Sequence, residues 1–409
     1  MIEQSKLAEA SFSSSKVCHS GAEIVERARA LIPTLRSRSA VTNENRCPPE
    51  ATKQDLKRAG VAQIFQPKRY GGAEARLKDG VDVLRAIGSG CGSTAWISAQ
   101  NVLHNFMISQ WPEAGQEEIW GSMPDALVSG ILIPGLGKVR KTDGGYIVSG
   151  RWPFVSGANI ADWLIFTGDC EESDGRIDDR HFLIPREKAE IIDTWHTIGL
   201  RGSASNDVAL NEVFVPSHMS VQMAQLKGHG RGPGSAVNKA PLYHLPAYAL
   251  FGCYIGSAAL GIAEAAVEHY IAGARNRAGT MSGAKLANYT TQQVKVAEAQ
   301  AAVTTARTLI YAVLEDAQAT ADSGRMTTTE DRARYRALAT YAGRLNASAV
   351  NIVLEASGGA VAYERNPLSL YFSDFTIGNR HTTQNWDVNA AAYGRVLLGL
   401  PIDNPALDE

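Results

Sequence analysis

The sequence lacks the features that mark several protein classes. Its 409 residues include only five cysteines, widely spaced and without a Cys-x-x-Cys pair. A scattered, odd-numbered set of this kind predicts neither a disulfide framework nor a cysteine zinc site. The nine histidines form no His-Glu-x-x-His or comparable cluster, and no serine lies in a Gly-x-Ser-x-Gly turn. We therefore expect no metal site, no serine nucleophile and a reducing compartment.

An excess of one charge is also missing. Forty Lys and Arg residues stand against 42 Asp and Glu, for a formal net charge of −2. This balance argues against nucleic-acid binding as the main function. No run approaches the ~18 consecutive apolar residues of a membrane span, and the first residues contain no apolar core of a signal peptide. We expect a cytoplasmic protein that binds neither nucleic acid nor membrane.

The first half of the chain divides into two regions after a flexible N-terminus (1–17). Residues 18–124 have the pattern of helices joined by short loops, and one of these helices is expected to begin at a cap, Ser93 or Thr94. Residues 125–222 predict a small β-domain, a barrel or a sandwich, with a hairpin turn at Thr142-Asp-Gly-Gly145. Its expected strands are Ala126–Ile133, Tyr146–Trp152, Trp163–Gly168, His181–Ile184 and Val208–Val215.

The second half begins with a Gly/Lys-rich connector loop (223–244), which predicts a flexible surface segment. Residues 245–409 have long helical periodicity, which predicts an antiparallel helical bundle. Two apolar stripes with alternating spacings of three and four are expected to face its core: Val296, Ala299, Val303, Ala306, Ile310, Val313 and Ala317, then Leu338, Tyr341, Leu345, Ala349, Ile352 and Ala356. The order predicts a mainly α protein with a central β-domain.

Four segments stand out by their residue types. Ser149-Gly-Arg-Trp-Pro-Phe-Val-Ser-Gly157 combines aromatic side chains with a hydroxyl and a glycine. Thr197–Val208 holds a run of small polar residues, whose backbone and hydroxyl donors suit a phosphate. Trp96 and His104 are eight residues apart, so both can share a helix face. Gly378-Asn-Arg-His-Thr-Thr383 is the fourth. A core strand, a polar turn or a packed histidine would give similar patterns.

Over nearly its full length the chain resembles the acyl-CoA dehydrogenase superfamily. Within it, these segments are most similar to the oxygenase components of two-component flavin-dependent monooxygenases, among them p-hydroxyphenylacetate hydroxylase, seco-steroid phenol hydroxylase and indole-oxidising relatives. The resemblance implies an N-terminal helical domain, a small β-barrel and a C-terminal helical bundle, assembled as a homotetramer. It also implies reduced FMN or FAD, brought by diffusion from a flavin reductase, and O2 as co-substrate. The implied reaction hydroxylates a small aromatic substrate of phenol or indole type through a C4a-hydroperoxyflavin.

The same resemblance implies roles for individual residues. Ser156 would lie near flavin N5, His381 would steer protonation with an ordinary pKa of ~6.5, and His104 would hold the substrate. The implied cofactor contacts are Trp152, Phe154, Ser156, Gly157, Arg201, Ser203, Ser205 and Arg277, the last by reaching the flavin phosphates of a neighbouring subunit. The implied substrate contacts are Trp96, His104, Ile131 and Thr383.

The sequence departs from the superfamily pattern in two places. No glutamate accompanies His381, whereas acyl-CoA dehydrogenases commonly carry one there as the base that a thioester substrate requires. Pro367-Leu-Ser-Leu-Tyr-Phe-Ser-Asp374 lacks the arginines of the usual Arg-Asp pair, which leaves the local ion pairing open. The apolar segment Ser129–Pro134 also indicates a substrate with little polar decoration. Alternatives remain: an FAD-dependent acyl-CoA dehydrogenase, a nitrogen- or sulfur-oxidising relative, or a non-catalytic helical scaffold.

Overall fold

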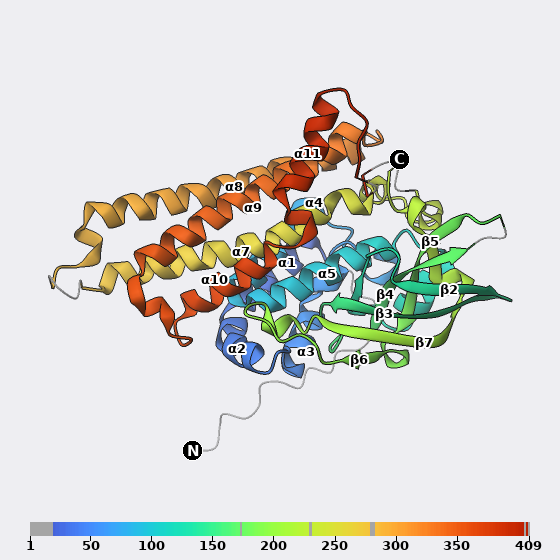
Figure 1. The fold of residues 1–409 in the computed structure, drawn as a ribbon, viewed down its shortest axis with the longest axis horizontal. Helices are drawn as coiled ribbons and strands as arrows, with labels where there is room; N and C mark the ends of the chain where they lie inside the picture. Colours follow the sequence, from blue (N-terminus) through green and yellow to red (C-terminus); the bar gives the residue numbers. More distant parts are fainter. Residues whose placement is uncertain (1–18, 172–173, 229–230, 279–282, 405, 408–409) are drawn as a thin grey trace, which may run out of the picture.

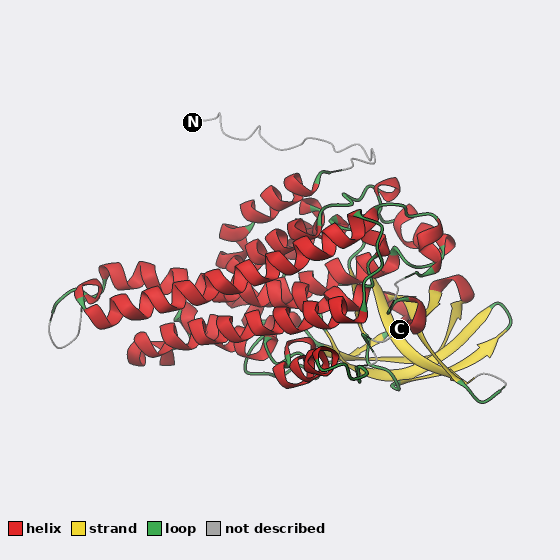
Figure 2. Ribbon diagram, turned by 90° about the horizontal axis from the view of Figure 1, so that it is seen from above, coloured by secondary structure: helices red, strands yellow, loops and turns green. Residues whose placement is uncertain are grey.

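The computed structural model describes residues 19–171, 174–228, 231–278, 283–404 and 406–407. The expected flexible N-terminus (1–17) lies outside them. The long helices of the C-terminal region run side by side and reach one end of the molecule, and the strands gather at the other end (Figure 1, Figure 2). The helical, sheet and helical regions follow one another along the chain in the order that the sequence predicts.

The N-terminal region is helical: α1 (Gly21–Ala30), α2 (Ile32–Glu44), α3 (Glu50–Ala59), α4 (Leu77–Gly90), α5 (Gly92–Ile108) and the short α6 (Glu113–Gln116). Every residue of α5 is buried. The prediction that a side chain of Ser93 or Thr94 caps this helix is wrong, because the helix begins at Gly92 and has no side-chain cap. The buried carboxylate of Asp374 accepts a hydrogen bond from the Ser93 backbone instead, so a distant residue satisfies the helix terminus.

The β-domain forms one sheet, with the strand order β6-β7-β3-β2-β4-β5-β8 and with β1 on a branch. Its strands are β1 (Val128–Ile131), β2 (Gly137–Thr142), β3 (Gly145–Val155), β4 (Trp163–Glu171), β5 (Ile177–Pro185), β6 (Glu190–Ile192), β7 (Asn206–Pro216) and β8 (Ser220–Gln222). The hairpin turn is confirmed, because Thr142 pairs with Gly145. Within the described ranges the sheet stays open between β6 and β8. The five expected strands omit β2, although the hairpin turn at its end was found, and they omit the short strands β6 and β8.

Strand β1 joins the sheet to the buried helix α5. It runs parallel to β4, and the amide of Val128 donates to Asn101 Oδ1 on α5 at 2.6 Å. The carbonyl of the same residue lies 3.0 Å from Nδ1 of His104. These contacts fix the face of α5 against the first strand, and the candidate site is built at this junction.

The connector lies partly on the surface, as its composition predicts, but buried residues anchor it, and residues 229–230 of its Gly-rich run lie outside the described residues. Gly234 packs so closely on the end of α5 that an added Cβ would lie 2.0 Å from the Ser109 carbonyl oxygen. Asn238 is buried and donates to that same carbonyl at 2.7 Å, and Tyr243 is fully buried. Glycine therefore serves close backbone approach here rather than flexibility.

The C-terminal region contains α7 (Ala247–Asn276), α8 (Thr290–Asp322), α9 (Thr329–Ala356), α10 (Pro367–Gly378) and α11 (Trp386–Leu397). Helix α7 is long and apolar enough to cross a membrane, but 94% of its most apolar window is buried inside the protein, as expected of a core helix. The stripe predicted on α8 is buried from Ala299 to Ala317. The stripe predicted on α9 is confirmed only in part. Ala349 is fully buried and Leu345 packs against the core, but Tyr341 is 41% exposed whereas Ala339 and Ala342, outside the stripe, are fully buried. Helix α9 packs against α7, α8 and α11, so its buried surface is wider than one stripe.

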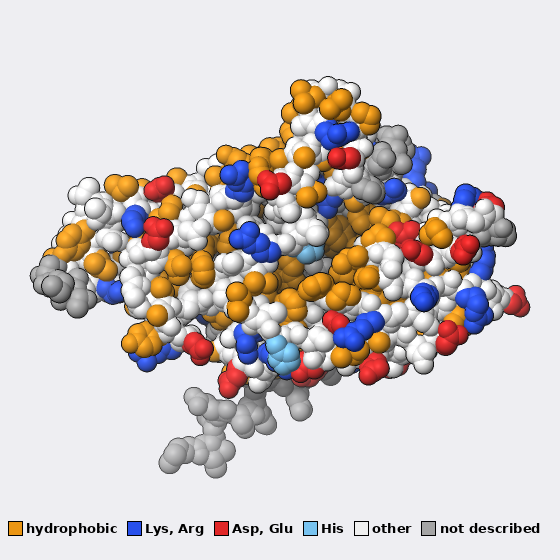
Figure 3. Space-filling view, viewed as in Figure 1, with side chains coloured by type: hydrophobic (Ala, Val, Ile, Leu, Met, Phe, Trp, Pro, Cys, Tyr) orange, Lys and Arg blue, Asp and Glu red, His pale blue; other side chains and the backbone are white. Residues whose placement is uncertain are grey.

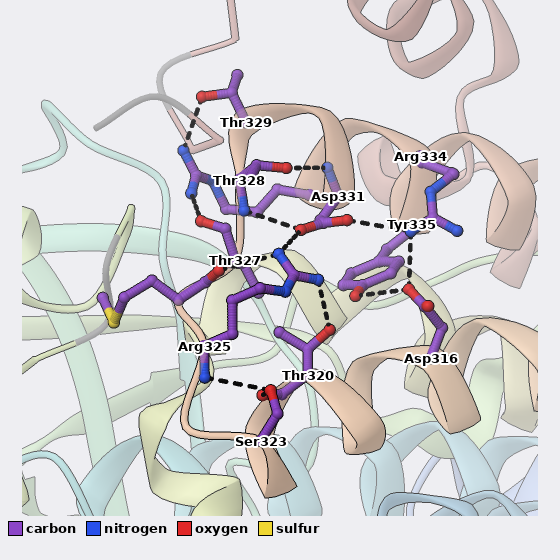
Figure 4. Close-up of polar contacts among 12 residues, drawn as sticks. Asp316, Thr320, Ser323, Arg325, Thr327, Thr328, Thr329, Asp331, Arg334 and Tyr335 are labelled. Atoms are coloured by element: carbon purple, nitrogen blue, oxygen red, sulfur yellow. Dashed lines mark hydrogen bonds and ion pairs between the residues drawn. The ribbon is translucent and has the colours of Figure 1, made fainter.

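Polar contacts fix the corner between α8 and α9 (Figure 4). Thr328 and Asp331 form a capping box at the start of α9. Arg325 donates to Asp331 at 2.7 Å, and Arg334 bridges Asp331 and Asp316 of α8. Burial opposes the charge of Asp331, but its hydrogen bonds with Arg325 and Thr328 prevail and lower its pKa to about 2. The start of α9 is therefore held in one position.

Candidate active site

The segments beside β3 and β7 contain strained backbone. Phe154, Leu200 and Ala204 have positive φ angles of 63°, 49° and 46°. Such angles are uncommon outside glycine and cluster at functional sites. Two apolar side chains nearby remain open to solvent, Phe154 at 56% and Ile198 at 80%. A strained backbone that presents exposed apolar side chains fits a flat, partly apolar group such as a flavin ring.

A chain of buried hydroxyls runs behind this segment. Trp96 Nε1 on α5 donates to Ser156 Oγ at 3.0 Å, Ser156 Oγ lies 2.8 Å from Ser205 Oγ, and Ser205 Oγ lies 2.7 Å from Ser203 Oγ. The amide of Gly157 donates to the Ser203 carbonyl at 2.8 Å. The structure thus brings together five residues that the sequence placed at the site.

His381 lies next to Trp96, at the end of this set of hydrogen-bonded residues. Its ring meets Trp96 edge-on, with the ring centroids 5.6 Å apart. The backbone N–H of Thr383 donates to Nδ1 at 3.3 Å, so Nδ1 accepts and the neutral ring carries its proton on Nε2. Desolvation, and then the charge of Arg336, lowers its pKa to about 4. The expected pKa of ~6.5 is therefore wrong. Thr383, expected at the substrate, contacts His381 through its hydroxyl as well.

His104 has the opposite tautomer. Its Nδ1 faces the Val128 carbonyl, which can only accept, so Nδ1 carries the proton and Nε2 presents a lone pair. Desolvation lowers its pKa to about 4, although the hydrogen bond to Val128 opposes the shift. Its Nε2 forms no hydrogen bond with the part of the chain that the structure describes. One neutral histidine is therefore a donor and the other an acceptor.

Sequence reasoning missed Ser129. Its hydroxyl is fully buried and has no hydrogen-bond partner. It lies beside Gly157, where an added Cβ would come within 3.0 Å of the hydroxyl oxygen. Ile131 is two residues further along β1, so the two side chains share a face of the strand. A single serine inside an apolar strand was the available signal. A buried hydroxyl without a partner needs a water or a ligand.

His181 and Tyr248 form a second pair that the sequence did not single out. His181 Nε2 lies 2.5 Å from the Tyr248 hydroxyl, and both side chains are buried. Desolvation first, then the charges of His104 and Arg180, lower the pKa of His181 to about 3. Its Nδ1 has no hydrogen-bond partner. Helix α7 and strand β5 thus add polar groups to the neighbourhood of His104.

The missing Arg-Asp pair has a structural replacement. Asp374 is buried and accepts from the Leu200 amide at 2.6 Å as well as from the Ser93 backbone. Desolvation raises its pKa to about 7, and these backbone hydrogen bonds only partly oppose the shift. The carboxylate therefore joins α10 to the strained loop and to the start of α5.

Three expected cofactor contacts lie apart from this cluster. Trp152 belongs to the sheet core, where it stacks on Phe166 at 4.5 Å and donates to the Thr167 carbonyl. Arg201 donates to backbone carbonyls of α2 and of its own loop. Arg277 is exposed and directly follows the last turn of α7. The role implied for it, in a neighbouring subunit, stays a prediction.

The geometry agrees with comparisons to known proteins. Residues 253–386 match the family "Acyl-CoA dehydrogenase, C-terminal domain". A pigment production hydroxylase from a Rhodococcus species is 31% identical over 94% of this chain and 98% of that protein. The oxygenase subunit HsaA of a flavin-dependent monooxygenase from Rhodococcus jostii is 32% identical over 92% of this chain and 99% of that protein.

Solved structures agree with these sequence relatives. XiaF from a Streptomyces species, in complex with FADH2 and glycerol, superimposes with a TM-score of 0.88 at 26% identity, over 94% of this chain and 97% of that one. The exposed apolar side chains of Phe154 and Ile198 and the hydrogen-bonded hydroxyls of Ser156, Ser205 and Ser203 fit a reduced flavin of this kind. On the face drawn in Figure 3, apolar side chains also surround a hollow in which a histidine is visible. The chain belongs to the flavin-dependent monooxygenases, as an oxygenase component on the acyl-CoA dehydrogenase fold.

Proposed function

We propose that this chain hydroxylates a small aromatic substrate of phenol or indole type, using O2 and a reduced flavin supplied by a partner reductase. One oxygen atom enters the ring and the other leaves as water. The bound flavin, FMN or FAD, supplies the two electrons that activate O2. The observation that carries the proposal is the pair of neutral histidines with complementary tautomers, His104 as acceptor and His381 as donor.

His104 would orient the substrate. Its free Nε2 lone pair accepts a hydrogen bond from a phenol O–H or an indole N–H, which raises the electron density of the ring. Because its pKa is about 4, the imidazole stays an acceptor at neutral pH. Ser129 offers a second hydroxyl contact, and Trp96 and Ile131 supply apolar walls. An electron-rich ring that is held in one orientation is what oxygen transfer requires.

Ser156 and His381 would act on the flavin side. Trp96 and Ser205 hold the Ser156 hydroxyl at a fixed position, and Thr383 fixes the His381 ring with Nε2–H outward. With a pKa of about 4, His381 donates a hydrogen bond at neutral pH without carrying a charge. The buried surroundings exclude water, which favours oxygen transfer over release of peroxide.

The dehydrogenase alternative lacks its base. Asp374, the acidic residue that precedes His381 in the chain, is occupied by the backbone amides of Leu200 and Ser93. Removal of a proton next to a thioester needs a carboxylate that is free to accept it. The turn supplies a histidine with a low pKa in its place, which favours oxygenation.

The active unit would be a cytoplasmic homotetramer that receives reduced flavin by diffusion. Apolar side chains that one chain leaves exposed support an assembly. They lie on α9, with Tyr341 41% exposed, and at the end of the chain, with Val388 at 52%, Leu397 at 60% and Leu398 at 78%. Sedimentation of the purified protein at several concentrations tests the tetramer.

Coupling of oxygen use to product tests the reaction. Replacing Ser156 or His381 with alanine should raise the share of O2 released as peroxide more than it weakens reduced-flavin binding. Protein that holds reduced flavin and a phenol or indole substrate is mixed with aerated buffer. Product, peroxide and flavin reoxidation are then measured together. Ser217→Ala, at an exposed position directly after β7, is the matched control. Unchanged coupling in both site variants would contradict these assignments.

A further inference from the structure

A buried arginine, Arg336, lies beside this site and has no counterion among the residues that the structure describes. Arg336 on α9 is only 7% exposed, and its Nε is sealed from solvent without a hydrogen-bond partner. Arg332, one turn earlier, is fully buried too, but it donates to the carbonyls of Leu407 and Thr327 at 2.8 and 2.9 Å. Within the described ranges, the groups whose charges act on Arg336 are Cys253 and Tyr248, and neither is a carboxylate.

This arrangement is costly to the folded protein. Desolvation lowers the pKa of Arg336 to about 10, so the side chain still carries its charge at neutral pH. A buried charge is normally paired, because an unpaired one costs several kcal/mol of stability. Asp179, whose charge acts on Tyr248, forms no ion pair with Arg336 in the part of the chain that the structure describes. Within the described ranges, no carboxylate therefore pairs with the guanidinium.

The charge of Arg336 acts on groups at both sides of the proposed site. It lowers the pKa of His381, on the proposed flavin side, and it acts on Tyr248, the partner of His181 near His104. Thr340 lies one turn after Arg336, on the same face of α9, and donates to the Thr383 carbonyl at 3.1 Å. Arg336 is therefore on the face of α9 that meets the His381 turn and α7.

We propose that Arg336 binds the anionic end of the substrate and that the substrate is an aromatic acid, whose carboxylate pairs with the guanidinium. The proposal rests on the proposed function and adds the class of substrate. A carboxylate would supply the missing counterion, and an arginine can hold it through two parallel hydrogen bonds. His104 would hold the hydroxyl or N–H of the ring while Arg336 holds the acid. The indication from Ser129–Pro134 of a substrate with little polar decoration then applies to the ring end alone.

Tyr248 would provide a second donor to the carboxylate. When neutral His181 carries its proton on Nε2, it donates to the phenol oxygen, and the Tyr248 proton is free to point elsewhere. In that tautomer Nδ1 keeps only a lone pair, which agrees with its lack of a partner. Tyr248 also stacks on Phe251, with centroids 5.6 Å apart, so its ring position is fixed.

Equilibrium binding of matched acid and amide probes tests the anion site. The probes are indole-3-acetate with indole-3-acetamide, and 4-hydroxyphenylacetate with its amide, added to flavin-free protein and to anaerobic protein with reduced flavin. For at least one ring type we expect the acid to bind about tenfold more tightly than the amide. Arg336→Met should weaken acid binding about 30-fold, as expected when one partner of a buried charge pair is removed, and leave amide binding unchanged. Arg336→Lys should keep part of the preference.

Two further variants sharpen the result. Arg344→Met removes an exposed arginine of the same helix, which lies over the Trp386 ring, and should leave the acid preference intact. Tyr248→Phe should reduce the preference by a few-fold, because it removes one neutral donor.

Thermal unfolding separates an anion-binding role from a structural one. An unpaired buried cation is destabilising, so Arg336→Met should raise the Tm of ligand-free protein. The acids should raise the Tm of the wild type more than that of the variant, because a ligand stabilises the folded state that binds it. A lower Tm in Arg336→Met together with an unchanged acid preference would overturn the proposal.

The remaining outcomes are also decisive. Equal affinity for acid and amide in both wild-type pairs would overturn the proposal. An equal loss of reduced-flavin affinity in Arg336→Met would assign the guanidinium to the flavin and overturn it as well. If the acid preference depends on Arg336 but no probe yields an oxygenated product, the anion site stands and the proposed hydroxylation of these ring types fails.

Discussion

The two sides of the candidate site treat their polar groups differently. On the flavin side, Trp96, Ser156, Ser205 and Ser203 satisfy one another in a continuous chain of hydrogen bonds. On the substrate side, the buried groups without partners include Ser129 Oγ and Arg336 Nε. The first side is complete before a ligand arrives and suits a cofactor of constant shape. The second has buried polar groups that only a ligand or a water would satisfy, so under the proposed function the choice of substrate would be made there.

His104 gives the largest expected effect. His104→Ala removes the acceptor at the substrate side, and kcat/KM for product should fall about 100-fold, at the low end of the range for a positioned acid–base group. Reduced-flavin affinity should stay unchanged, and His104→Gln should recover part of the activity because its amide oxygen can still accept. Initial rates of product formation and a flavin titration measure the two properties. An equal loss of both would show that the sides are not separate.

Two serines offer a matched pair with opposite expectations. Ser129→Ala should weaken substrate binding by up to about tenfold and leave the Tm unchanged or raised, because this hydroxyl has no partner in the protein. Ser205→Ala should leave substrate binding intact but reduce stability by about 1–3 kcal/mol, because it strands two buried hydroxyls. Substrate titration and urea unfolding of both variants check this. The reverse pattern would contradict the division into two sides.

Acid pH should destabilise the fold through histidines on both sides. The pKa values of His104 and His381 are lowered to about 4 and that of His181 to about 3. The unfolded chain binds protons near pH ~6.5, so their stabilisation is present above that pH and is lost as the pH falls toward 4. Asp374 and Asp179, with pKa values raised to about 7 and about 6, act in the opposite direction. Among these five groups, three histidines act against two aspartates, so together they lower the free energy of unfolding as the pH falls below ~6.5.

Urea unfolding between pH 5 and 7.5 measures this smallest effect. Each histidine contributes a slope of about 1.4 kcal/mol per pH unit. His104→Gln should flatten the acid loss by about that amount, whereas Asp374→Asn should steepen it. Identical pH slopes in wild type and His104→Gln would show that His104 is not held neutral by the fold.

The sequence predicts the regions of the fold because their signals are local. Strand alternation, the 142–145 turn and the stripe on α8 each extend over a few turns or one hairpin. The predicted start of α5 was wrong, and the predicted buried face of α9 was incomplete, for the opposite reason. Asp374, more than 280 residues away, satisfies the first turn of α5, and α9 has neighbours on several sides.

The site divides in the same way. Ser156, Ser203, Ser205 and His381 belong to contiguous motifs, so the sequence could single them out, and the structure places them close together. Ser129 and Arg336 could not, because each is identified by what it lacks in three dimensions, a hydrogen-bond partner or a counterion. In the sequence Arg336 is one of three arginines within five residues, Arg332, Arg334 and Arg336, a pattern typical of a solvated helix face.

The corner between α8 and α9 has a consequence for the engineering of this enzyme. Arg336 follows directly after Tyr335, whose hydroxyl donates to Asp316 at 2.9 Å, and Arg334 is bound to the same carboxylate. An α-helix turns by about 100° per residue, so the contacts drawn in Figure 4 set the direction in which Arg336 leaves the helix. If Arg336 binds the substrate carboxylate as proposed, substitutions at this corner would change which acids bind. They would do so without replacing a residue that contacts the acid. A library designed to alter substrate choice should therefore include the corner or deliberately hold it constant.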